Sequence, residues 1–191
     1  MIALVVPLAL SHVLTRCAPA VGPVTMSAIV AYESGGRPYA IGDNTVRRSY
    51  FPPDSTGAQA LAMGLLRAGH NIDVGYAQIN SANFRRYDLS LKTAFDPCTN
   101  VATGADILRR AYAGAARAYG AGQVALVHAL SAYNTGGYFA GMAYARGVYA
   151  EASALRFERG PSFERMTLAS RAAPGARAVT FVPARRAPSK R

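Results

Sequence analysis

Residues 25–36 read Thr25-Met26-Ser27-Ala28-Ile29-Val30-Ala31-Tyr32-Glu33-Ser34-Gly35-Gly36, and this stretch decides the fold of the 191-residue chain. One face of an α-helix collects side chains at the spacing i, i+3, i+4 and i+7, and the residues at that spacing are Met26, Ile29, Val30 and Glu33. The pattern predicts a helix packed on the core, with Glu33 at the position of the next apolar side chain. Glu33 is also the only glutamate among the first 150 residues.

The predicted end of this helix makes the position of Glu33 still less usual. Gly35 and Gly36 favour a helix end just after Ser34, which puts the carboxyl group near the negative end of the helix dipole. Burial and the dipole both disfavour the carboxylate, so we expect a pKa above the ordinary value of about 4.3. A glutamate that stays protonated near neutral pH can act as a general acid. The alternative is a carboxylate that turns outward, caps a neighbouring segment or pairs with Arg37.

The composition indicates one globular domain followed by a basic tail. Apolar residues make up 51% of the chain, and its length suits a single core. The formal net charge is +11, but residues 152–191 contain nine Lys or Arg and only two Glu, so most of the excess lies there. We therefore predict a folded domain over residues 1–159 and a flexible basic tail over residues 160–191.

This distribution of charge argues against a nucleic-acid-binding protein. Such a protein is expected to interleave Lys or Arg with exposed aromatic side chains along one element of its body. Here the excess charge lies in the tail, and the tyrosines fall mainly on apolar stripes. No specific nucleic acid is therefore expected as a partner, and the simplest role of the tail is solvation or loose attraction to an anionic surface.

The apolar residues 1–14 are too few to cross a membrane as a helix, so no transmembrane span is predicted. The stretch also lacks the basic start of a typical signal peptide. Its apolar spacing is typical of a first core helix. An atypical export signal is the alternative.

Cys17 and Cys98 are the only cysteines, and their separation matches no zinc or redox motif. The residues alone leave two states open. Both thiols can be reduced in the core of a cytosolic protein, or the two can form a disulfide in an oxidising compartment. No metal site and no cofactor are expected.

Most of the remaining chain is predicted to be helical, so the expected fold class is mainly α. Apolar periodicity predicts helices over residues 58–67, 98–119, 123–134 and 138–157, and Asp96-Pro97 is typical of a helix start. Residues 37–57 are expected to form loops. Residues 71–80 alternate by two, which predicts an extended segment with Tyr76, Gln78 and Asn80 on one face. The amides of this face can meet a ligand, or they can line a solvated strand edge.

Three short stretches place polar side chains beside glycine at the ends of apolar elements: Glu33-Ser34-Gly35-Gly36, Gly75-Tyr76-Ala77-Gln78-Ile79-Asn80 and Ala132-Tyr133-Asn134-Thr135-Gly136-Gly137. In this order and at this separation they resemble the lytic transglycosylases of the soluble lytic type, over residues 17–150. The resemblance implies a goose-lysozyme-like fold, that is, a lysozyme-like α+β domain with a small β segment near residues 71–80.

Other stretches look like the branch of this family that serves type IV secretion and conjugation: Cys17-Ala18-Pro19, residues 33–42, Gln78-Ile79-Asn80 and Phe95-Asp96-Pro97-Cys98 with Asn100. Members of this branch act in the periplasm, where they open peptidoglycan locally for an envelope-spanning machine. The resemblance therefore implies a periplasmic protein, peptidoglycan glycan strands as its partner and substrate, components of a secretion system as further partners, and a disulfide between Cys17 and Cys98. The unconvincing export signal departs from that pattern.

The resemblance also implies a reaction that needs a single carboxyl group. Glu33 would protonate the glycosidic oxygen between N-acetylmuramic acid and N-acetylglucosamine. It would then act as the base when the C6 hydroxyl of muramic acid attacks the anomeric carbon, which leaves an anhydromuramic end and consumes no water. Assistance from the substrate's acetamido group replaces the second carboxylate of most glycosidases.

The remaining site residues are assigned by the same resemblance. Tyr133 would hydrogen-bond to Glu33 and orient it, although a core tyrosine with a satisfied hydroxyl is the alternative. The expected saccharide-binding residues are Ser34, Tyr76, Gln78, Asn80 and Asn134. Tyr76 replaces the leucine or methionine that is commoner in this motif, which alters the surface offered to a sugar ring.

Two other functions stay open. One is a hydrolytic muramidase in which Asp43 or Asp73 activates a water molecule. The other is a non-catalytic factor that uses the same cleft to dock on peptidoglycan.

Overall fold

The computed structural model describes residues 5–157, and helix α2 (Pro23–Ser34) lies at its centre. Pro23 occupies the first turn of α2, as predicted. Every residue from Thr25 to Val30 is at most 2% exposed, so the helix is buried on all sides and not along one stripe only. Helices α1 and α7 pack directly against it. The predicted basic tail lies outside the described residues.

The prediction of a mainly α fold is confirmed. Besides α2, the described residues contain α1 (Leu8–Cys17), α3 (Ser55–Arg67), α4 (Leu91–Ala94), α5 (Pro97–Tyr119), α6 (Gln123–Thr135), α7 (Met142–Ala154) and a short 3-10 helix η1 (Ser81–Asn83). Helix α5 begins as Asp96-Pro97 predicts, because the Asp96 side chain accepts a hydrogen bond from the Thr99 backbone N–H at 2.8 Å. Helix α3 begins earlier than predicted, since the Asp54 side chain caps it in the same way. The last helix is shorter at both ends than its predicted range.

A four-stranded antiparallel sheet occupies part of the chain that was predicted to be loop. Its order is β3 (Arg48–Tyr50), β2 (Ile41–Asp43), β4 (Ile72–Val74) and β5 (Ile79–Asn80). The predicted β segment at residues 71–80 is confirmed, but it is not one continuous strand. Gly75 at φ 80° and Gln78 at φ 45° turn the chain back on itself, so Val74 pairs with Ile79.

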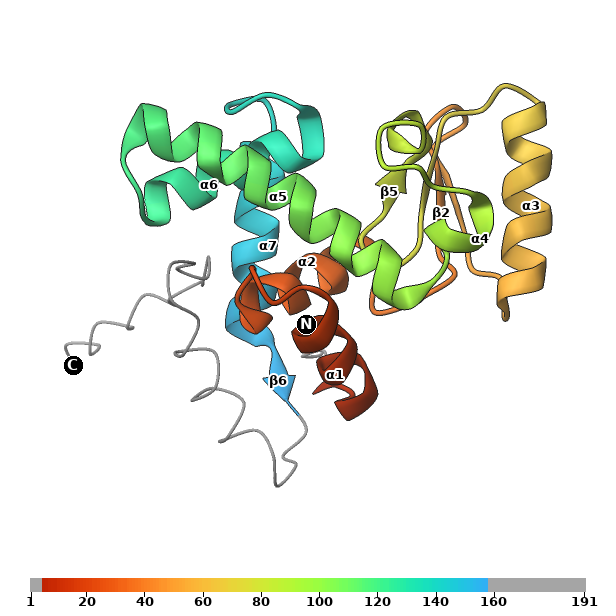
Figure 1. The fold of residues 1–191 in the computed structure, drawn as a ribbon, viewed down its shortest axis with the longest axis horizontal. Coiled ribbons are helices and arrows are strands. Elements are labelled where there is room, and N and C mark those ends of the chain that lie inside the picture. The colour runs from red at the N-terminus through yellow and green to blue at the C-terminus, as the bar shows by residue number, and fades with distance from the viewer. Residues whose placement is uncertain (1–4, 158–191) are drawn as a thin grey trace, which may run out of the picture.

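The described residues form two hydrophobic cores, and Phe84 and Leu89 pack against both. The larger core is helical and includes Met26, Ile29, Leu108 and Leu126. The smaller core lies between the sheet and α3, and its members are Ile41, Ala58, Ala62, Ile72, Val74, Ala94 and Phe95. Figure 1 shows the sheet and α3 at one end of the molecule, α6 at the other, and α5 running between them, with α1 and α2 below the middle of α5.

The N-terminal helix belongs to the larger core, as predicted. Leu10 and Leu14 of α1 are 5% and 1% exposed. The short strand β1 (Val5–Val6) precedes α1 and pairs in parallel with β6 (Arg156–Phe157), which joins the start and the end of the described chain. None of the helices within residues 5–157 is both long and apolar enough to span a membrane.

Cys17 and Cys98 form a disulfide, with their Cα atoms 5.3 Å apart. The alternative of two reduced thiols is therefore wrong. The bond ties the end of α1 to the first turn of α5 across 81 residues of sequence. It thus closes a long loop that contains α2, the whole sheet and α3.

A loop of this length predicts a large effect on stability. Cross-linking restricts the unfolded chain, and the restriction grows with loop length. We expect the double variant Cys17→Ser/Cys98→Ser to lose about 2–4 kcal/mol of unfolding free energy, measured by urea denaturation.

A reductant provides the matched control for this comparison. Dithiothreitol should lower the urea midpoint of the wild type towards that of the double variant and leave the double variant unchanged. Equal midpoints for the oxidised wild type and the double variant would show that the bond contributes nothing to stability.

Candidate active site

Glu33 lies in the last turn of α2, as predicted. Gly35 ends the helix in the left-handed region at φ 59°, and its N–H donates to the Ala31 carbonyl at 3.0 Å. The Glu33 side chain is half-buried and lines a cleft of about 620 Å³ between the helices and the sheet. Arg37 does not pair with it: the guanidinium donates to the Ser34 carbonyl at 3.4 Å and lies 4.6 Å from the centre of the Phe51 ring.

The surroundings of Glu33 raise its pKa from the ordinary 4.5 to about 7. Burial is the main cause, and the negative charge of Asp73 acts in the same direction. A hydrogen bond from Tyr144 opposes both, because it stabilises the carboxylate. The carboxyl group can therefore give up and take back a proton near neutral pH.

The hydroxyl that contacts Glu33 belongs to Tyr144 of α7 and not to Tyr133. Tyr144 donates a hydrogen bond to Glu33 Oε1 at 2.6 Å, whereas Tyr133 donates to the Ala77 carbonyl at 2.7 Å. The prediction that Tyr133 bonds to Glu33 is therefore wrong. The two rings lie nearly parallel with centroids 6.1 Å apart, so Tyr133 supports the tyrosine that holds Glu33. Burial, and then the charge of Glu33, raise the pKa of both hydroxyls well above the ordinary value, so both stay protonated donors.

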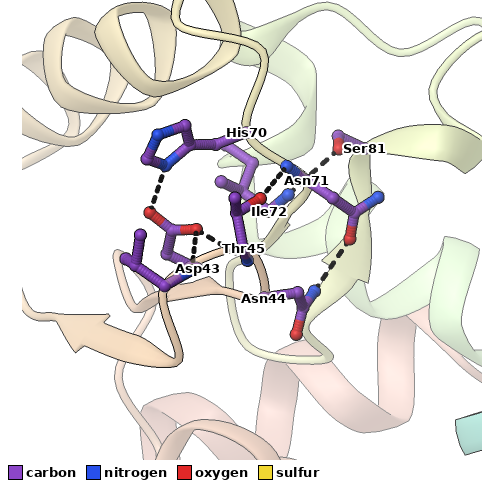
Figure 2. Close-up of polar contacts among 8 residues, drawn as sticks. Asp43, Asn44, Thr45, His70, Asn71, Ile72 and Ser81 are labelled. Atoms are coloured by element: carbon purple, nitrogen blue, oxygen red, sulfur yellow. Dashed lines mark hydrogen bonds and ion pairs between the residues drawn. The ribbon is translucent and has the colours of Figure 1, made fainter.

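Asp73 lies on the cleft lining and is held by two amides. Asn44 donates to Asp73 Oδ2 and Asn80 donates to Asp73 Oδ1, each at 2.7 Å. Burial raises the pKa of Asp73, and these two hydrogen bonds oppose the shift. Figure 2 shows how Asn44 also reaches Asn71, to which it donates at 2.9 Å. The amides thus anchor the carboxylate on the sheet side of the cleft.

Asp43 has a structural environment, although it is close to Asn44 in sequence. It is 2% exposed, and its carboxylate accepts from the backbone N–H groups of Thr45 and Val46. His70 Nδ1 lies 2.6 Å from its other oxygen (Figure 2). Burial works against ionisation, but the contacts with His70 and the two N–H groups prevail and lower the pKa of Asp43. Asp43 therefore closes the turn between β2 and β3 and does not line the cleft.

Three predicted saccharide-binding residues do line the cleft. Asn134 is exposed at the end of α6. Gln78 uses its amide N–H groups on the carbonyls of Ala40 and Gly75, at 3.1 Å and 2.8 Å. Asn80 bonds to Asp73 and, through its side-chain oxygen, caps η1 at the Ala82 N–H. The amides of Gln78 and Asn80 therefore line the cleft and also hold its wall together through these hydrogen bonds.

Ser34 and Tyr76 differ from their predicted placement. Ser34 is 3% exposed, and its hydroxyl donates back to the Val30 carbonyl within α2. Tyr76 is half-buried against the helical core. Neither side chain is on the cleft lining. Nothing in the sequence indicated that these two side chains point away from the cleft.

Asn100 holds the turn that carries Gln78. Its side chain is 1% exposed, accepts from the Ala77 N–H at 2.8 Å, and donates to the carbonyls of Val74 and Ala94. Gly75 is required beside it, because a Cβ there would lie 2.3 Å from the Asn100 amide nitrogen. The sequence indicated Asn100 only as part of a family motif, and not what it does.

Several cleft residues had no signal in the sequence: Asn44, Arg86, Tyr87, Arg110 and Tyr138, together with Tyr144 behind Glu33. Tyr144 lay within a predicted helix rich in alanine and tyrosine, where nothing distinguished it from Tyr149. Only the packing of α7 on α2 determines which tyrosine reaches Glu33.

The chain is similar to several proteins named virB1. It is 39% identical to protein virB1 of Rhizobium radiobacter over 146 residues, which are 75% of this chain and 61% of that protein. It is 40% identical to protein virB1 of Agrobacterium fabrum (strain C58 / ATCC 33970) over 142 residues, 73% of this chain and 58% of that protein. It is 40% identical to the type IV secretion system protein virB1 of Brucella abortus biovar 1 (strain 9-941) over 127 residues, 66% of this chain and 53% of that protein.

The matches cover only part of each relative. The chain spans about three fifths of the virB1 proteins of Rhizobium radiobacter and Agrobacterium fabrum, and about half of the Brucella abortus protein. No solved structure matches it significantly. Residues 15–155, which include every cleft residue named above, match the family described as the transglycosylase SLT domain. The chain belongs to the transglycosylase SLT domain family.

Proposed function

We propose that the protein is a peptidoglycan lytic transglycosylase that cleaves the bond between N-acetylmuramic acid and N-acetylglucosamine and leaves anhydromuramic ends. The observation that carries the proposal is Glu33, a carboxyl group with a pKa of about 7 on the lining of a polar cleft. Membership of the transglycosylase SLT domain family supports the same activity. The chemistry is acid catalysis followed by base catalysis at one residue.

In the first step, protonated Glu33 gives its proton to the glycosidic oxygen as the bond to the anomeric carbon breaks. The substrate's acetamido group stabilises the positive charge that develops at that carbon. Tyr144 holds Glu33 Oε1 at 2.6 Å and stabilises the carboxylate that the step produces. In the second step, this carboxylate takes the proton from the C6 hydroxyl of muramic acid as the hydroxyl oxygen closes the anhydro ring.

Asp73 has a supporting role in this scheme. Its charge raises the pKa of Glu33 and so keeps the acid protonated before the reaction. Two amides already bond to its two oxygens. A hydrolytic muramidase is the second candidate function, with Asp73 activating a water molecule. Asp43 is not available for that part, since it lies outside the cleft lining in the turn between β2 and β3.

A periplasmic location and a role in a secretion system form the outer part of the proposal. The Cys17–Cys98 disulfide favours an oxidising compartment. The similar virB1 proteins include one named as a type IV secretion system protein. The protein would open peptidoglycan locally so that such a machine can cross it, with components of the machine as partners. A non-catalytic docking factor would use the same cleft without the chemistry of Glu33.

Replacing the acid tests the core of the proposal. Glu33→Gln keeps the shape of the side chain but removes the transferable proton, so digestion of purified sacculi should fall about 10²–10⁴-fold. Wild-type products, analysed by mass spectrometry, should carry anhydromuramic ends.

The control is Glu151→Gln, because Glu151 is the other glutamate among the described residues and lies on α7 away from the cleft. It should digest sacculi like the wild type. Reducing ends in place of anhydro ends would favour the muramidase, and full activity of Glu33→Gln would favour the docking factor.

The Tyr144 hydrogen bond predicts a shift in the pH profile. The bond stabilises the carboxylate, so Tyr144→Phe should raise the pKa of Glu33 further. Because the first step needs protonated Glu33, the alkaline limb of kcat/KM should move to higher pH by roughly one pH unit, with a lower maximum. The measurement is the rate of turbidity loss of sacculi as a function of pH.

Tyr149→Phe is the matched control, since Tyr149 is on the same helix and its hydroxyl donates to Gln123. Its profile should coincide with that of the wild type. A shift of the Tyr144→Phe limb to lower pH would contradict the assigned hydrogen bond.

A further inference from the structure

A second groove opens beside the cleft and shares part of its wall. It has a volume of about 690 Å³ and runs between residues 86–87 and the first four turns of α5. Arg86, Tyr87 and Arg110 line both the groove and the cleft. The two spaces therefore meet at a pair of arginines. Figure 1 shows that this part of α5, next to α4, faces the sheet end of the molecule.

We infer that this groove binds the peptide branch that muramic acid carries, and that Arg86 recognises a carboxylate of that branch. The inference rests on the proposed function, since it assumes that a glycan strand occupies the cleft. A strand in the cleft has to direct its peptide branches out of it. The groove is a polar exit that begins on the cleft wall.

The charge of the groove suits an anionic peptide. Arg86 is exposed and has no ion-pair partner among residues 5–157; its guanidinium lies 5.7 Å from the centre of the Tyr87 ring. Arg110 already pairs with Asp106, which also accepts from Arg109 at 2.6 Å. Asp106 thus pairs with two arginines, and Arg86 is the arginine at the junction that has no carboxylate partner within residues 5–157. Guanidinium groups bind carboxylates through paired hydrogen bonds.

The rest of the groove offers contacts for a peptide and few for a second sugar. Thr99, Ala102 and Thr103 of α5 line it, together with Cys98 of the disulfide. Within residues 5–157, the only aromatic ring on its lining is Tyr87. Peptide branches of peptidoglycan carry free carboxylates, whereas its unmodified sugar rings carry no charge and the lactyl carboxyl group is an amide wherever a branch is attached. Because the branch is tethered to a bound sugar, even one exposed ion pair increases affinity without a separate association step.

The test compares two ligands on a protein that cannot cleave them. In the Glu33→Gln background, calorimetry measures the Kd of a peptidoglycan tetrasaccharide with its peptide branches and of the same tetrasaccharide after an amidase has removed them. We expect the branched ligand to bind about fivefold more tightly. Adding Arg86→Gln should abolish most of this ratio, and Arg86→Glu should reverse it by repulsion.

Arg85→Gln is the matched control, because Arg85 is equally exposed but lines neither groove nor cleft. It should keep the wild-type ratio. Equal Kd values for both ligands, or an unchanged ratio in both Arg86 variants, would overturn the inference and leave the proposed function intact. If neither tetrasaccharide binds, the proposed function fails first.

Discussion

The structure depends on a carboxyl group that is kept at the boundary between the core and the cleft. Glu33 cannot turn away, because α2 is buried from Thr25 to Val30 and ends at Gly35. The position of the whole helix therefore keeps the Glu33 side chain buried, and this burial raises its pKa. The raised pKa of Glu33 lowers the stability of the folded state. Between pH 4.5 and about 7, Glu33 is ionised in the unfolded chain and protonated in the folded chain. The folded state is accordingly favoured less as the pH rises through this range.

The opposite wall of the cleft is placed by hydrogen bonds that cross between the two cores. Asn100 on α5 holds the turn between β4 and β5, and Tyr133 on α6 donates to the Ala77 carbonyl of the same turn. The disulfide fixes the start of α5, which carries Asn100. The sheet thus places Asp73 and Asn80 on the lining of the cleft that Glu33 also lines. Because of this arrangement, the charge of Asp73 raises the pKa of Glu33.

Much of this fold could be predicted because its helices are long enough to show their period. Glu33 was placed by the i, i+3, i+4, i+7 pattern, and the start of α5 by Asp96-Pro97. Strands β2 and β3 have only three residues each and were expected to be loop, whereas the alternation over residues 71–80 did indicate an extended segment but not the turn that divides it into β4 and β5. The hydroxyl partner of Glu33 was misassigned because Tyr144 lies 111 residues away and reaches it only through the packing of α7 on α2. Ser34, in turn, was expected in the cleft from the family resemblance, whereas its place on the helix directs it inward.

The most direct measurement of the central claim is the titration of Glu33 itself. Carbon-13 NMR of the side-chain carboxyl groups, with the Glu33 signal identified by its loss in Glu33→Gln, reports the protonation of this residue without substrate. We expect a midpoint at about pH 7. A midpoint near the ordinary 4.5 would contradict it, since Glu33 would then be ionised at neutral pH and unable to donate the proton.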